Sequence, residues 1–271
     1  MGGLLDFHFM QNAYAAGTLV AVLAGAAGYF VVLRGQSFVA HMLSQIGFPG
    51  AAAGVLLHVS PVLGLLVFCG AGALAISALG REVDAGDRRE SAAVGSILAL
   101  ALGLGLLFVR LHGGGTQAIY SFLFGTILGI TDADVLLTAA VAIAGLAVLA
   151  LIGRPLVFAS VDPDVAEARG VPVAALSTAF LLILAVSVAI TVQISGTLLI
   201  FALLVAPAAA ALQLTAHPVA GVAASIALSV GVTWVGLGLA YFTDLPVGFF
   251  VTTLAFGAYA AVRSAKAVVA A

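Results

Sequence analysis

The chain has 271 residues, of which 63% are hydrophobic and only 7% charged, and its mean hydropathy is +1.28. A soluble domain carries roughly a quarter charged residues, so this composition excludes an ordinary soluble protein and indicates helices surrounded by lipid. The formal net charge of −2 gives no sign of a nucleic-acid partner.

Long apolar runs separated by short polar stretches predict about nine transmembrane helices, because each crossing needs about 20 mostly apolar residues. In chain order we expect them near 13–33, 38–58, 61–79, 91–110, 133–152, 172–192, 195–214, 217–240 and 246–263. The stretch 118–130 is apolar but short, and we expect it to be re-entrant or interfacial, so the count is eight to ten. The prediction is an all-α, polytopic membrane protein with one transmembrane domain over 1–271.

The basic residues set the expected orientation, because Lys and Arg are retained on the cytoplasmic side of a membrane. With nine spans and the N-terminus outside, eight basic residues fall inside: Arg34, Arg81, Arg88, Arg89, Arg154, Arg169, Arg263 and Lys266. Only Arg110 then falls outside. We therefore predict an N-terminus outside and a C-terminus in the cytoplasm.

The second predicted span carries His41, Ser44 and Gln45. Ligand-type residues within a span are costly and are candidates for function. His41 and Gln45 are four residues apart and share one helix face. Imidazole is a good ligand for zinc, manganese and similar ions, and a Gln carbonyl is a weaker oxygen ligand. Two copies around a two-fold axis would present both residues twice to a central path. The alternative is that His41 lies near the headgroups and hydrogen-bonds to a neighbour.

A bend is expected directly after this pair. Pro49 removes a backbone hydrogen bond, and Gly47 and Gly50 permit bending. A bend beside a polar pair suits a gated pathway, and it is also a common packing device.

Between the fifth and sixth predicted spans the chain is polar but has the pattern of a short helix. Asp162 followed by Pro163 is typical of a helix N-cap with proline at the first helical position. Asp164 and Glu167 put negative charge in the first turn, and Gly170 ends the helix. The pattern predicts a short amphipathic helix on the cytoplasmic face.

Other polar residues lie at the edges of predicted loops. His58, His112 and His217 are expected to be solvated or structural, and Asp132 and Asp134 to be the N-cap and a first-turn acid of the fifth span.

Catalytic signatures such as GxxxxGK[ST], HExxH, CxxC and GxSxG do not occur in the sequence. If ATP drives this protein, hydrolysis is therefore expected on a separate chain, and we expect no permanently bound cofactor.

Five segments in order resemble the permease subunits of the zinc/manganese-type ABC importers, the ABC-3 family. They are FMQNAYAAGTLVAVLAGAAGYFVVLRGQSF (9–38), YSFLFGTILGIT (120–131), VDPDVAEARGVPV (161–173), SGTLLIFALLVAPAAAA (195–211) and YFTDLPVG (241–248). The resemblance spreads over nearly the whole chain, and each segment alone is modest.

The resemblance implies a homodimeric permease of a bacterial cytoplasmic membrane, which moves a divalent metal, zinc or manganese or else iron, by alternating access. It also implies two copies of an ABC ATPase subunit, which a coupling helix near 161–171 contacts, and an extracytoplasmic metal-binding protein. The alternatives are a permease for a metal chelate of the siderophore or cobalamin type and, less well supported, a channel or an intramembrane enzyme.

One departure from the family pattern falls on the candidate ligands. The family's second span typically reads Asp-Ala-Leu-Ser-His, and its Asp and His face the metal path. Here His41 stands in place of that Asp, Ser44 is kept, and Gln45 stands in place of that His. The site keeps one imidazole per subunit and loses its carboxylate, which should weaken attraction for a hard ion such as Mn²⁺.

Overall fold

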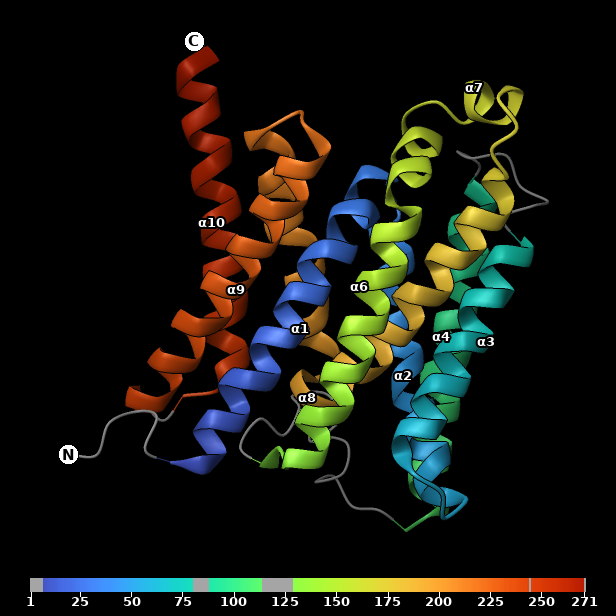
Figure 1. Ribbon diagram of the computed structural model, residues 1–271. Coiled ribbons are helices and arrows are strands. Elements are labelled where there is room, and N and C mark those ends of the chain that lie inside the picture. The colour runs from blue at the N-terminus through green and yellow to red at the C-terminus, as the bar shows by residue number, and fades with distance from the viewer. Residues whose placement is uncertain (1–6, 80–87, 114–128, 244, 271) are drawn as a thin grey trace.

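The computed structural model describes residues 7–79, 88–113, 129–243 and 245–270, and these form an all-helical bundle (Figure 1). The helices are α1 (His8–Leu33), α2 (Ser37–Leu56), α3 (Pro61–Leu79), α4 (Arg88–Leu111), α6 (Asp132–Val161), α7 (Pro163–Ala168), α8 (Val173–Leu214), α9 (Pro218–Thr243) and α10 (Val247–Ala270). Within the described ranges, seven stretches are long and apolar enough to cross a membrane, and 95–111 and 199–214 are shorter apolar helices. The predicted all-α, multi-span fold is confirmed.

Helix α8 consists of two spans that meet at a reversal. Phe180 packs on Phe30 of α1 with ring centroids 6.2 Å apart. Leu204 lies against the same part of α1, since a methyl group at Gly28 would collide with the carbonyl oxygen of Leu204. A straight helix would separate Phe180 from Leu204 by about 36 Å, so the chain turns back between them. It does so at Gly196, whose φ of 80° and ψ of 164° only glycine adopts readily.

Helix α1 begins and helix α10 ends at opposite ends of the bundle (Figure 1). The end at which α1 begins is called the N-terminal end, and α7 lies at the other end together with the C-terminal part of α10. Helix α4 ends, and α6 begins, at the N-terminal end. Most of the element expected at 118–130 falls outside the described residues.

Helix α6 extends further than its sequence predicts. We expected the span to stop at 152 because Gly, Arg and Pro follow, but the helix continues to Val161 with Pro155 inside it. Leu156 and Ala159 are fully or almost fully buried, and this tertiary packing outweighs the helix-breaking tendency of proline.

Helix α2 is the most enclosed span, with α3, α4 and α8 packed around it. It crosses α3 at two glycines: a methyl group at Gly64 would collide with the carbonyl oxygen of Gly50, and one at Gly50 would lie 2.6 Å from that of Gly64. Small residues let transmembrane helices approach this closely. The crossing holds the polar part of α2 inside the bundle.

Candidate functional site

The predicted ligand pair lies on the accessible strip of an otherwise buried helix. From Val39 to Gly54 every residue of α2 is buried except His41 and Gln45, which are partly exposed. The two positions are one turn apart and share a face, as their spacing predicts. A pathway or a second copy of the chain could therefore reach α2 at these two side chains.

His41 has one side-chain nitrogen that the fold leaves unpaired. Its ring packs edge-on against Phe201 of α8, with centroids 4.9 Å apart and planes at 67°. Its Nδ1 atom is buried and has no hydrogen-bond partner among the described residues. Buried polar atoms in native proteins almost always have a partner, so an unpaired imidazole nitrogen is a candidate ligand atom.

Ser44 does not join the pair. Its side chain is fully buried, and its Oγ donates a 2.6 Å hydrogen bond to the backbone carbonyl oxygen of His41. Serine commonly bonds to its own helix in this way. The pattern that drew attention to His41, Ser44 and Gln45 therefore contributes two candidate ligands.

One chain supplies an incomplete set of metal ligands. Among the described residues, no group of three or more His, Cys, Asp or Glu side chains could hold a metal ion. Divalent metals take four or more ligands, so His41 and Gln45 would need water or the same residues of a second copy. The donors are nitrogen and amide oxygen, a set that suits borderline ions such as zinc better than hard ones.

The predicted bend residues are part of the helix packing. Gly47, Pro49 and Gly50 are all buried, and Pro49 lies within α2 without ending it. Gly47 faces Leu65 of α3. These contacts give the packing interpretation a structural basis, and the gating interpretation stays a prediction.

The short cytoplasmic helix expected after Asp162 is α7. The Asp162 side chain caps it, with Oδ1 accepting a 3.0 Å hydrogen bond from the Val165 amide, and Pro163 occupies the first turn. At its C-terminal end Gly170 has a φ of 80°. The amide of Val171 donates to the carbonyl of Ala166 at 3.0 Å, which closes the turn.

Helix α7 presents nearly all of its side chains outward. Ala166 is completely buried and attaches the helix to the bundle. Asp164, Glu167 and the other residues of the helix are exposed, including Val165 at 43%. The exposed acidic side chains and Val165 offer a mixed polar and apolar surface for a partner protein.

Arg34 connects three helices through its side chain, a role that we did not predict from the sequence. The sequence indicated only that it is a cytoplasmic basic residue within a segment that resembles the family. Its Nη2 donates to Ser177 Oγ of α8 at 2.6 Å, and its Nη1 to Ser160 Oγ of α6 at 3.3 Å. The guanidinium also lies over the Phe180 ring, 5.8 Å from its centroid. Burial lowers the pKa of Arg34, although an arginine remains charged at neutral pH. It therefore ties the end of α1 to both helices that flank α7.

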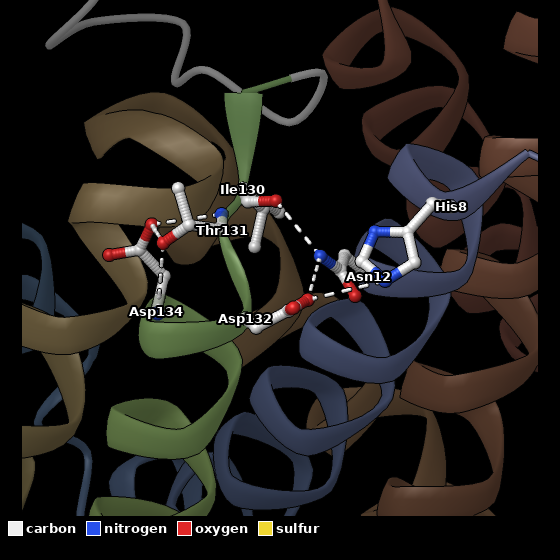
Figure 2. A network of polar contacts seen from close by, with 6 residues as sticks. All are labelled: His8, Asn12, Ile130, Thr131, Asp132 and Asp134. Carbon is white, nitrogen blue, oxygen red and sulfur yellow. Dashed lines mark hydrogen bonds and ion pairs between the residues drawn. The ribbon is translucent and has the colours of Figure 1, made fainter.

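A polar network joins the starts of α1 and α6 at the N-terminal end of the bundle (Figure 2). Asn12 Nδ2 donates to the Asp132 carboxylate at 2.8 Å and to the Ile130 carbonyl at 3.2 Å. His8 Nε2 lies 3.6 Å from the same carboxylate.

The N-cap of α6 in this network differs from the prediction. Thr131 is the cap and forms a reciprocal capping box with Asp134, while Asp132 is the first helical residue. Asp132 is instead turned toward Asn12 (Figure 2). We chose the wrong residue because aspartate is the commoner cap, whereas here Thr131 gains a reciprocal bond from Asp134 three residues later.

Two manganese import permeases are similar in sequence to this chain over most of its length. The chain is 32% identical over 209 residues to the manganese import system permease protein ScaB of Streptococcus parasanguinis, covering 77% of this chain and 73% of that one. It is 30% identical over 247 residues to ScaB of Streptococcus gordonii, covering 91% and 87%.

Two solved structures have folds similar to that of this chain. PsaBC from Streptococcus pneumoniae, determined in complex with a Fab, has a TM-score of 0.86 at 27% identity, covering 96% of this chain and 92% of that one. A transporter assigned to the metal-chelate type, in an inward-facing conformation, has a TM-score of 0.64 at 18% identity, covering 96% and 88%, and is similar in fold alone. The sequence also matches the ABC 3 transport family over residues 6–265, and the chain belongs to that family.

Proposed function

We propose that this chain is the permease subunit of an ATP-driven importer that carries a divalent metal ion, zinc or manganese or else iron, into the cytoplasm. The observation that carries the proposal is the pair on α2. His41 and Gln45 are the accessible positions between Val39 and Gly54 of an otherwise buried span, and His41 Nδ1 has no partner among the described residues. The similarity to permeases named for manganese import supports the same cargo class.

The proposed metal path runs between two copies of the chain. Each copy contributes one imidazole and one amide oxygen, and together they make a four-donor site that neither chain holds alone. Gly47, Pro49 and Gly50 lie directly after this pair and are the proposed gate. Alternating access then exposes the site first to the outside and then to the cytoplasm.

The proposed partners meet opposite ends of the bundle. The exposed side chains of α7 face an ABC ATPase subunit, two copies per dimer, which hydrolyses ATP. A metal-binding protein outside the membrane delivers the ion at the N-terminal end. The proposed location is a bacterial cytoplasmic membrane, with the N-terminus outside.

Transport of a metal chelate is less well supported. The metal-chelate transporter resembles this chain in fold alone, and the imidazole on α2 is a ligand suited to a bare ion.

The test is uptake by the permease reconstituted with its ATPase in proteoliposomes, with the metal-binding protein added and Zn²⁺, Mn²⁺, Fe²⁺ and a ferric siderophore supplied separately. We expect ATP-dependent accumulation of a bare ion, with zinc favoured by the nitrogen donors. Accumulation of the siderophore without any bare ion would instead establish the chelate function. Flux that is independent of ATP would contradict the importer assignment.

A further inference from the structure

Two histidines at the N-terminal end of the bundle form a pair that the proposed metal path does not use. His58 follows α2, and His112 follows α4. Their ring centroids are 6.1 Å apart, with planes at 65°. Both side chains are exposed, so an ion in solution can reach them.

We propose that His58 and His112 form a surface site for a borderline transition metal ion of the Zn²⁺ class, with water completing the coordination. A zinc ion bound tetrahedrally to two imidazole nitrogens at about 2.0–2.1 Å holds the two ring centres roughly 5–5.5 Å apart. The observed separation of 6.1 Å is within about 1 Å of this range, a difference that rotation of the exposed side chains can close. Imidazole donors favour Zn²⁺, Cu²⁺ and Ni²⁺ over Mn²⁺, which prefers oxygen.

The backbone at His58 supports a role for its side chain. His58 has a φ of 55° and is the one non-glycine residue with positive φ among the described residues. Its amide donates to the Val55 carbonyl at 3.2 Å, and that of Val59 to the Gly54 carbonyl at 2.9 Å, so His58 is the residue that ends α2 in a left-handed turn.

The corresponding positions after α1 and α7 are glycines, Gly35 and Gly170. A side chain in this conformation lowers stability relative to glycine. The chain therefore keeps an imidazole where glycine would fit better, and places it beside a second imidazole.

The two helix ends are already held close together. Phe48 and Ala52 of α2 pack with Val109 of α4 in one apolar cluster, about one to three turns before the histidines. A metal ion bound to both imidazoles would join the end of α2 to the end of α4, and α2 carries His41.

The experiment measures Zn²⁺ binding to the purified full chain by calorimetry, with a purification tag that contains no histidine. All five histidines of the sequence are tested one at a time. His58→Gly and His112→Ala should each weaken one zinc site by at least about tenfold. His8→Ala and His217→Ala, which change the other exposed histidines, should leave that site intact. Unchanged zinc binding in both His58→Gly and His112→Ala, or equal losses in the controls, would overturn the proposal.

His58→Gly also separates a ligand from a structural residue. Glycine suits the left-handed turn, so the metal-free variant should melt about 1–3 °C higher than the native chain while binding zinc more weakly. Lower stability in metal-free His58→Gly would mean that the imidazole is structural.

The proposal can be separated from metal transport. Binding measured in a His41→Ala background removes the proposed path, and the His58–His112 site should persist there. Loss of all zinc binding in His41→Ala alone would overturn the surface site and leave the proposed transport function standing.

Discussion

The guanidinium of Arg34 donates to the hydroxyl of Ser177 at 2.6 Å, across the junction between the end of α1 and the start of α8. The same guanidinium reaches Ser160 at the end of α6. One charged side chain therefore holds together the two helices from which α7 extends.

Replacing this arginine should loosen the base of α7. Arg34→Ala removes three charge-assisted hydrogen bonds, to Gln36, Ser160 and Ser177, and we expect the free energy of unfolding to fall by about 1.5–3 kcal/mol. Arg34→Lys should recover part of this loss, because lysine keeps the positive charge but lacks the planar guanidinium that donates to two serines at once. Arg263→Ala is the matched control, since Arg263 is exposed and bonds to Tyr259 of its own helix. Equal stability of Arg34→Ala and Arg263→Ala in detergent would contradict this role.

The acidic side chains of α7 should be required for binding of the ATPase subunit. Asp164→Lys and Glu167→Lys reverse exposed charges, so we expect loss of ATPase pull-down and of uptake with no change in the melting temperature of the permease. Gly170→Pro should also reduce pull-down and uptake, because proline cannot adopt the positive φ of this position and would distort the end of α7. Pull-down that survives all three changes would remove the coupling role from α7.

Loss of the imidazole at position 41 should stop transport without disturbing assembly. We expect His41→Ala to lower ATP-driven metal uptake at least about tenfold. Ser44→Ala is the control one turn away, since its hydroxyl bonds only within its helix, and it should transport normally. His41→Asp should shift preference from Zn²⁺ toward Mn²⁺ by supplying a hard oxygen ligand. Normal uptake by His41→Ala would show that the path lies elsewhere.

The crossing of α2 and α3 should tolerate no side chain. In Gly64→Ala the new methyl group would meet the Gly50 carbonyl oxygen, and we expect a loss of about 1–3 kcal/mol in stability from the forced separation. Gly70→Ala on the same helix has open space, so it should be neutral or slightly stabilising. Thermal unfolding followed by the fluorescence of the single tryptophan, Trp234, distinguishes the two. A Gly64→Ala variant as stable as Gly70→Ala would disprove the close crossing.

The membrane orientation can be tested with single cysteines at the two ends of the bundle. Leu57 and Val161 are 69% and 71% exposed. Leu57 directly follows α2 and Val161 is the last residue of α6, and these two helices end on opposite sides. An impermeant thiol reagent should label Leu57→Cys in intact cells and Val161→Cys only after permeabilisation. The native Cys69 is completely buried and should not react. The reverse pattern of labelling would invert the topology.

Local patterns predicted the spans and α7 well, because the relevant forces act within a few residues. Apolar run length defines a span, and the cap at Asp162 lies three residues from the amide that it binds. The error at α6 arose where packing of Leu156 and Ala159 outweighed a local helix-breaking signal.

Contacts between distant segments could not be predicted in this way. Arg34 meets side chains 126 and 143 residues away, and the contact of His41 with Phe201 depends on how α8 turns back. The pairing of His58 with His112 requires two helix ends to meet in space. Helix packing in a membrane relies on small residues and shape, and these leave little periodic signal in the sequence.

The reversal at Gly196 also bears on how the protein enters the membrane during synthesis. No charged residue occurs between Arg169 and His217, so the insertion machinery receives one apolar stretch about twice as long as a bilayer is thick. No polar loop marks where the first crossing should stop. We therefore expect the two halves of α8 to enter the lipid together as a helical hairpin, whose turn is formed at Gly196.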